Sequence, residues 1–398
     1  MSATPILRFS DKNGQPFPEW ESMFIGDYLT KKSIKQVPTD DAPLMSFVAH
    51  RGVVEKGDKY DRSHLVKSKD KKYKRTDLND FIYSSNNLDV GSIGLNKHGS
   101  AVISEVYEIF SINDAANPDF ISEVIQMPET IDKIIRFRQG CLYGQYKIYP
   151  EDFLDVEINM PTKEEQDKVA AFLSLYDQKI ENQMAKVEAL ETRRKGLLQQ
   201  IFSQEIRFKA DDGSEFPDWE SHAMGEFFTE RKEKAQGGEE LLSVTIANGV
   251  IRQADSDKRD NSSEDKSNYK RVMTGDMAYN TMRMWQGAEG VSYWDGIVSP
   301  AYTIIVPEDG VNAEFFMVLF KTYEALKQFT IYSQGMTSDQ WNLKFDIFAD
   351  LEFDVPCSEE QAKIVAFFKL LDKQIQIEKD KLDAIKQVKK GLLQQMFV

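Results

Sequence analysis

Residues that could carry out catalysis are few and scattered in this sequence of 398 residues. The four histidines, none of which lies in an HExxH motif or beside a nucleophile motif, are His50, His64, His98 and His222. The two cysteines, Cys141 and Cys357, lack the spacing of a zinc site or a disulfide framework. No GxxxxGK[ST] phosphate loop occurs either. These patterns predict a chain with no catalytic centre, no metal and no nucleotide-driven motor.

The tetrapeptide Asn117-Pro118-Asp119-Phe120 comes nearest to a catalytic motif, since amino-methyltransferases carry Asn-Pro-Pro-aromatic. It lacks the second proline, and the similar tetrapeptide at 312–315, Asn-Ala-Glu-Phe, lacks both. An asparagine, a proline, an acid and an apolar ring in this order are typical of a helix start. We therefore predict helix caps at both places. An independent methyltransferase is excluded because the sequence lacks a cofactor loop.

Basic residues that could bind phosphates crowd into one segment, between Lys56 and Arg75. The net charge of −15 argues against a chain that coats nucleic acid by itself, because such binding comes mainly from Lys and Arg. Any DNA binding must therefore come from localised basic groups, although a solvated loop is the alternative interpretation of this segment. The candidate phosphate contacts are Lys67, Lys69, Lys71, Lys72, Lys74 and Arg75.

The sequence contains an internal duplication, which dictates its architecture. Residues 7–21 recur 199 positions later as 206–220, and residues 161–202 recur 195 positions later as 356–397. Between these blocks the two halves diverge, and only a thin thread of identical residues remains. The thread pairs Asp80 with Asp276, Tyr83 with Tyr279, Tyr107 with Tyr302, Gln139 with Gln334 and Phe153 with Phe348. One common scaffold with two different surfaces is the pattern that this divergence predicts.

Each second block begins with a helix signal and continues as a heptad repeat. Residues 162–165 form a capping box, and residues 358–361 form a similar one displaced by a residue. Apolar residues then recur at heptad spacing for about 35 residues. We predict an α+β protein with variable segments 1–160 and 203–355, separated by long helices over 161–202 and 356–398.

Polar residues interrupt the apolar seam of each helix and predict how the helices pair. They are Gln183 and Arg194 in the first helix and Glu378 and Lys389 in the second. A parallel pairing sets Arg194 opposite Lys389, which is electrostatically costly. An antiparallel intramolecular coiled coil, with Arg194 opposite Glu378 and Gln183 opposite Lys389, avoids this and creates a pseudo-twofold axis. A coiled coil with another chain is the alternative.

Two variable segments alternating with two long helices, each opened by Pro-x-x-x-Glu-Gln, resemble the specificity subunits of type I restriction-modification enzymes. The resemblance covers the whole chain. It implies that each variable segment is a target-recognition domain for one half of a bipartite, asymmetric DNA site. Segments 279–288 and 333–338 look like loops that are common in the recognition domains of this family.

The side chains of these segments suit base recognition. Arg283 and Gln286 can make the paired hydrogen bonds that distinguish guanine and adenine in the major groove. Trp285 could act as a stacking surface, although a core position is the alternative. The candidate DNA contacts of the second domain are Arg283, Trp285, Gln286, Gln334, Thr337 and Ser338. Those of the first domain, besides the basic segment, are Asn96, Lys97, Gln139, Tyr143 and Gln145.

The resemblance also implies the partners of the chain. These are double-stranded DNA, two methyltransferase (modification) subunits docked on the helices, and restriction/translocase subunits in the full complex. S-adenosylmethionine, ATP and Mg are expected on those subunits. The specificity subunit of a type IIB system and a duplicated protein-binding scaffold are the alternatives. No apolar run approaches the roughly 20 residues that cross a bilayer, so we expect a cytoplasmic protein without membrane contact.

Overall fold

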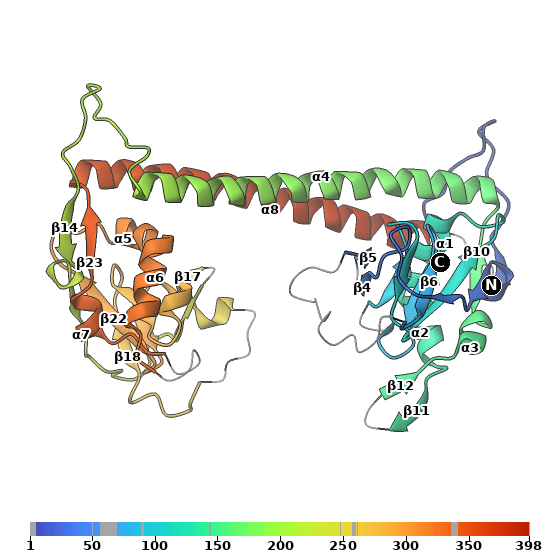
Figure 1. Cartoon of the computed structure of the whole chain (residues 1–398), viewed down its shortest axis with the longest axis horizontal. Helices are drawn as coiled ribbons and strands as arrows, with labels where there is room; N and C mark the ends of the chain where they lie inside the picture. The colour runs from blue at the N-terminus through green and yellow to red at the C-terminus, as the bar shows by residue number, and fades with distance from the viewer. Residues whose placement is uncertain are drawn as a thin grey trace. The chain divides into compact units, whose positions relative to one another are not determined.

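The chain divides into two compact units, which are described separately. The computed structural model describes residues 5–49, 51–55, 70–88, 91–142, 145–246, 248–256, 260, 262–335 and 341–397. The first unit comprises residues 1–183 and 381–398, and the second comprises residues 184–380. Each unit therefore contains one of the two variable segments and parts of both long helices (Figure 1).

The first unit is built on a four-stranded sheet of order β2-β10-β7-β8, accompanied by smaller sheets. The strands are β1 (Glu21–Phe24), β2 (Leu29–Lys32), β3 (Lys35–Gln36), β4 (Ser46–Val48), β5 (Gly52–Val54), β6 (Tyr73–Thr76), β7 (Phe81–Ser84), β8 (Ile93–Leu95), β9 (Ala101–Ile103), β10 (Tyr107–Ile112), β11 (Gln139–Leu142), β12 (Gln145–Lys147) and β13 (Glu157–Met160). The helices are η1 (Ile25–Asp27), α1 (Pro118–Gln126), α2 (Pro128–Ile135) and α3 (Pro150–Leu154).

The second unit repeats this plan with a sheet of order β15-β22-β19-β20. Its strands are β14 (Glu220–Ala223), β15 (Phe228–Glu230), β16 (Leu242–Thr245), β17 (Gly249–Arg252), β18 (Lys270–Val272), β19 (Met277–Asn280), β20 (Glu289–Val291), β21 (Gly296–Val298), β22 (Tyr302–Pro307) and β23 (Glu352–Val355). Its helices are η5 (Met224–Glu226), η6 (Gln253–Asp255), η7 (Met284–Gln286), α5 (Ala313–Leu319), α6 (Tyr323–Tyr332) and α7 (Phe345–Ala349). The prediction of an α+β fold with two similar domains is confirmed.

The thread of identical residues forms the interior of each domain. Tyr83 and Phe153 lie with ring centroids 4.7 Å apart, and their counterparts Tyr279 and Phe348 lie 5.4 Å apart. All four side chains are buried, and such ring pairs stabilise a core by about 1 kcal/mol beyond their burial. The identical residues between the two blocks therefore preserve a core, while the loops above it differ.

The predicted helix caps at the two Asn tetrapeptides are confirmed. The Asn117 side chain accepts hydrogen bonds from the backbone N–H groups of Asp119 and Phe120 at the start of α1. Asn312 accepts one from Phe315 at the start of α5. These asparagines therefore satisfy backbone donors that a helix start leaves without partners.

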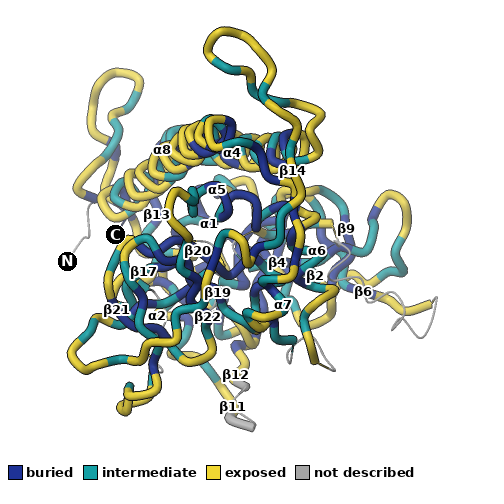
Figure 2. The backbone as a smooth tube through the Cα atoms, turned by 90° about the vertical axis from the view of Figure 1, so that its left-hand side faces the viewer, coloured by how far each residue is buried: buried dark blue, intermediate teal, exposed yellow. Residues whose placement is uncertain are grey.

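The long helices are α4 (Lys163–Phe202) and α8 (Ser358–Met396), which are largely exposed (Figure 2). Both helices begin where the sequence predicts, but the prediction that each begins with a capping box is wrong. Glu165 does not reach back to the helix start and instead binds Arg8, with Oε2 2.7 Å from Nη2. Gln166 donates to the Pro161 carbonyl at 2.9 Å. The second copy repeats both contacts at the opening of α8, which explains the Pro-x-x-x-Glu-Gln pattern.

Within each unit, opposite ends of the two helices pack together. In the first unit Leu173 of α4 shares a buried cluster with Met396 of α8. In the second unit Ile201 of α4 shares a cluster with Ile364 and Phe368 of α8. The antiparallel pairing is therefore confirmed.

The predicted register of the pairing was wrong by almost a heptad. Arg194 binds Asp372 rather than Glu378, which lies 3.0 Å from Lys186 instead. Lys389 binds Asp177 at 2.7 Å and Glu123 at 3.0 Å rather than Gln183. The prediction matched seam positions only, whereas Asp177 and Asp372 flank the seam and are about half exposed. These flanking carboxylates neutralise both basic seam residues.

Candidate nucleic-acid interface

The candidate loop of the second domain joins β19 to β20 and carries three predicted contacts. Arg283 precedes the short helix η7, which contains Trp285 and Gln286. Gly287 ends the turn in the left-handed conformation, with φ of 78°. Trp285 donates to the Met282 carbonyl at 3.1 Å and is partly buried against the domain core. Its ring is therefore anchored, and Arg283 and Gln286 border it.

A second segment of this domain lies beside that loop. The Leu343 N–H donates to the Thr281 carbonyl at 2.9 Å, and the Trp341 ring meets Trp285 edge to face at 5.2 Å. Exposed Gln334 pairs with Asn342 at the base of this segment. The structure therefore brings Gln334 to the same edge of the domain as Arg283. The predicted contacts Thr337 and Ser338 lie outside the described residues.

Several predicted contacts of the first domain lie within or beside undescribed segments. Lys67, Lys69 and Tyr143 are outside the described residues, and Gln145 begins β12. Lys71 and Lys72 are exposed immediately before β6, with the Lys71 ammonium 5.3 Å from the Tyr73 ring centroid. Their contact with phosphates stays a prediction.

Lys74 and Arg75, in contrast, bond to other residues of the first domain. Lys74 donates to the Tyr107 carbonyl at 2.6 Å and to Glu108 at 3.0 Å, and its side chain is only 13% exposed. Lys270 makes the same contact with the Tyr302 carbonyl in the second domain. The prediction that Lys74 binds phosphate is therefore corrected to a framework role, since both domains use this lysine to join two strands.

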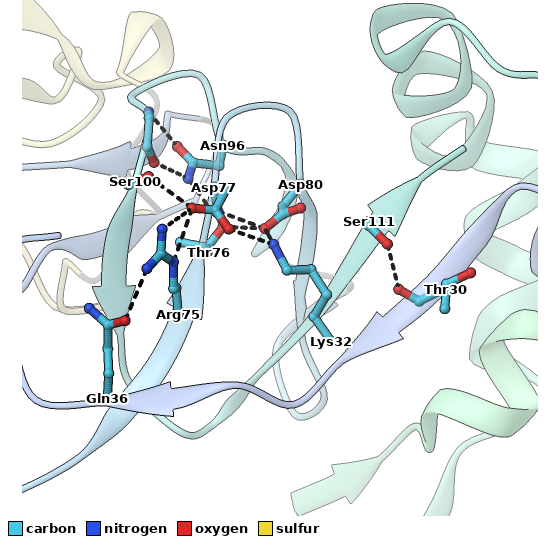
Figure 3. A network of polar contacts seen from close by, with 11 residues as sticks. Thr30, Lys32, Gln36, Arg75, Thr76, Asp77, Asp80, Asn96, Ser100 and Ser111 are labelled. Carbon is cyan, nitrogen blue, oxygen red and sulfur yellow. Dashed lines mark hydrogen bonds and ion pairs between the residues drawn. The ribbon is translucent and has the colours of Figure 1, made fainter. Parts of the chain in front are cut away.

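Arg75 belongs to a polar network that also contains the predicted base contact Asn96 (Figure 3). Arg75 donates to Asp77 and Gln36, and Asp77 accepts from Lys32 at 2.8 Å. Asn96 is fully buried, and its amide bonds to the Thr76 hydroxyl and the Gly99 carbonyl. Asn96 therefore holds its own loop and does not reach the surface, contrary to the prediction.

The remaining candidates of the first domain lie at its surface. Lys97 is 2.5 Å from Asp119 and donates to Asn79, and Gln139 donates to Asp152 at 2.7 Å. The ion pair of Lys97 is exposed, and surface ion pairs contribute little to stability, so it does not exclude a contact of this lysine with DNA. Lys97 and Gln139 therefore stay predictions.

The second domain has a buried ion pair that sequence reasoning missed. Glu289 of β20 is 1% exposed, and Lys321 Nζ lies 2.9 Å from its Oε1. The corresponding residues of the first domain are Ile93 and Gln126. Burial raises the pKa of Glu289 to about 7, against the opposing charge of Lys321. Glu289 is charged, whereas the corresponding strand residue of the first domain is apolar, and this difference could have revealed the buried ion pair.

We expect Glu289→Gln to stabilise the second unit above pH 7 and to have little effect near pH 5. A carboxyl group with a raised pKa in the folded state loses stabilising free energy as pH rises through that pKa, here up to about 3 kcal/mol. Thermal unfolding between pH 5 and pH 9 measures this, with exposed Glu220→Gln as the control. A variant that follows the wild-type midpoint at every pH contradicts the expectation.

Sequence reasoning also missed Asn86 and Asn87, which are exposed in the loop between β7 and β8. Tyr83 and Tyr279 are 196 positions apart, and applying the same offset to the residues that follow Tyr83 could have revealed them. This offset aligns the loop with the one that carries Arg283.

Neither unit shows a cluster of metal-ligating side chains or a membrane-spanning helix within its described ranges. Groups of three or more His, Cys, Asp or Glu side chains placed to hold a metal do not occur there. The long helices α4 and α8 are both too polar to cross a bilayer. The candidate interface therefore consists of hydrogen-bonding side chains on loops above a scaffold that occurs in both domains.

Comparison with known proteins supports the resemblance seen in the sequence. The family model "Type I restriction modification DNA specificity domain" matches residues 18–192 and 254–387. The type I restriction-modification system S subunit from M. genitalium has a similar fold, with 14% identity, a TM-score of 0.57 and coverage of 100% of this chain and 99% of that chain. A chain from "Structural basis underlying complex assembly and conformational transition of the type I R-M system" has 14% identity, a TM-score of 0.55 and coverage of 96% and 98%. Because the family model matches more than half of its residues, this chain belongs to the type I restriction-modification DNA specificity family.

Proposed function

We propose that this chain selects the DNA sequence on which a type I restriction-modification complex acts and catalyses no reaction itself. It reads a bipartite, asymmetric target, one half with each recognition domain. The observation that carries this proposal is a framework that occurs twice beneath loops that differ. The ion pairs at the helix openings and the core aromatics are duplicated, whereas Arg283, Trp285 and Gln286 have no identical counterpart.

The helices dock two copies of a modification subunit in this proposal. Supporting it, a set of matching apolar residues occurs once in each unit, in which the phenylalanines are partly buried against the core and the leucine of the long helix is exposed. We call these sets the repeated apolar faces: Leu7, Phe9, Ala171, Phe172 and Leu175 in the first unit, and Ile206, Phe208, Ala366, Phe367 and Leu370 in the second. Leu175 is 53% exposed and Leu370 is 70% exposed. An apolar residue that stays exposed in both copies has no core to serve, so a partner is the simplest reason to retain it.

The phosphate charge is neutralised largely by the partner subunits in this scheme, because the chain carries a net charge of −15. S-adenosylmethionine belongs to the modification subunits, and ATP and Mg belong to the restriction/translocase subunits. The specificity subunit of a type IIB system remains an alternative assignment, which differs in its partners. The acidic charge favours a second candidate, a scaffold that binds proteins with both domains.

Mapping of adenine methylation tests the proposal. In a methylation-free host that expresses this chain with the methyltransferase encoded beside it, we expect one bipartite motif with a fixed gap. Arg283→Ala combined with Gln286→Ala is expected to relax one half of the motif, since each paired base contact contributes about 1–3 kcal/mol of discrimination. Absence of methylation from a complex that assembles and binds S-adenosylmethionine contradicts the proposal and favours the scaffold.

A further inference from the structure

The loop between β7 and β8 in the first domain has the same frame as the loop between β19 and β20 in the second. Ser84 N–H donates to the Ser92 carbonyl at 2.8 Å, and Asn280 N–H donates to the Ala288 carbonyl at 2.9 Å. Each bond joins residues eight positions apart in the sequence. The two loops are therefore closed by equivalent bonds over equal lengths of chain.

The interior bonds of the loops also correspond. Asn87 N–H donates to the Ser84 carbonyl at 3.3 Å, as Arg283 N–H donates to the Asn280 carbonyl at 2.9 Å. Leu88 and Met284, the next residues, are both buried, and each loop ends at a glycine with φ near 80°. The backbone therefore places Asn87 where the second domain has Arg283.

A neighbouring segment holds both loops at the same place. Gln139 pairs with Lys147 in the first domain, as Gln334 pairs with Asn342 in the second. The residue after each pair donates to its loop, Ile148 to the Ser85 carbonyl at 3.1 Å and Leu343 to the Thr281 carbonyl at 2.9 Å. Each loop consequently stands beside an aromatic residue at an equivalent position, Tyr146 or Trp341, and the Arg138 guanidinium lies 5.3 Å from the Tyr146 ring centroid.

The side chains at the matched position are chemically suited to different bases. Asn87 is exposed and Arg283 is partly exposed. Within the described residues neither side chain makes a hydrogen bond, so both keep their donors for a ligand. An asparagine amide pairs with the adenine edge in the major groove, whereas a guanidinium pairs with guanine.

We infer that Asn87 determines one base of the half-site read by the first domain, at the position where Arg283 determines a base of the other half-site. This inference rests on the proposed function. It moves the reading surface of the first domain from Lys74 and Asn96, which serve the framework, to the loop between β7 and β8. Tyr146 and Arg138 border that surface and contribute to it.

Exchange of the two residues tests the inference in the full complex. Asn87→Arg is expected to change base preference at one position of one half-site by roughly tenfold to a hundredfold, the effect of one paired base contact. The other half-site and the gap stay unchanged and report that the variant folds. Arg283→Asn is expected to produce the mirror result in the other half-site. Methylation mapping measures both.

Asn182→Arg is the matched control, because Asn182 is also exposed but lies on α4 outside the recognition domains. A motif left unchanged by Asn87→Arg overturns the inference while leaving the proposed function intact. A wild-type complex that methylates no bipartite motif overturns the proposed function itself. If Asn87→Arg abolishes methylation, binding of the assembled complex to duplexes varied one base pair at a time decides the matter. Loss of discrimination at one base pair supports the inference, and uniform weakening overturns it.

Discussion

Replacing Arg8 with alanine is expected to destabilise the first unit by about 3 kcal/mol. Glu165 is buried, and its carboxylate is held by the Arg8 Nε at 2.9 Å and Nη2 at 2.7 Å. Removing the arginine leaves a charge inside the protein without its partner, which costs far more than loss of a surface ion pair. Hydrogen exchange at the first turns of α4, together with thermal unfolding, measures the loss.

The second unit supplies the control for this prediction. Arg207 binds Glu360 in the same way, but the Trp219 indole also donates to Glu360 at 3.0 Å. Arg207→Ala is therefore expected to cost less than Arg8→Ala. Adding Glu165→Leu to Arg8→Ala should recover much of the stability, because it removes the buried charge. Equal losses in the two units, or no recovery, contradict the account.

Charged residues on the repeated apolar faces are expected to remove the modification subunits one at a time. Leu175 and Leu370 lie on α4 and α8 and occupy matched, exposed positions. If each lies at the centre of a docking site, Leu175→Asp or Leu370→Asp costs at least about 2 kcal/mol, or roughly thirtyfold in Kd, at one site. Native mass spectrometry should show two partner subunits on the wild type, one on each single variant and none on the double variant.

Met184→Asp is the matched control for these changes. Met184 is 51% exposed on α4, but its counterpart in the second copy is Lys379, so it belongs to no repeated face. The Met184 variant should retain two partner subunits. Two subunits on the Leu175/Leu370 double variant place the docking site elsewhere on the chain.

The duplication made the fold predictable to a large extent. The two halves can be aligned with each other, so residues that are identical in both, such as Tyr83 and Phe153, indicated the core. The heptad repeats indicated the helices α4 and α8. The helix register was not predictable from seam positions alone. It depends on Asp177 and Asp372 beside the seam, whose reach toward Lys389 and Arg194 depends on side-chain direction rather than heptad position.

The candidate interface was harder to predict than the fold. A cluster of lysines in the sequence does not reveal which of them is taken up inside the domain, as Lys74 is by Glu108. Polarity alone also drew attention to Asn96, although loops often bury an asparagine to bond their own backbone. The loop with Asn87 carries no motif, so only the offset of 196 pointed to it, and its backbone bonds identify it as the counterpart of the Arg283 loop.

In the first unit the two ends of the chain lie side by side, whereas the chain runs without a break through the equivalent place in the second unit. The Leu7 N–H donates to the Gln395 carbonyl, and the Ile206 N–H donates to the carbonyl of Gln200, the counterpart of Gln395. Phe397 packs beside Phe120 as Phe202 packs beside Phe315. A circular permutation could therefore join residues 397 and 7 through a short linker and open the chain between 203 and 205. The first unit would then have continuous chain at this place, and the second unit would hold the two ends. We therefore expect the permuted chain to fold, because each half would keep these contacts whichever half is synthesised first.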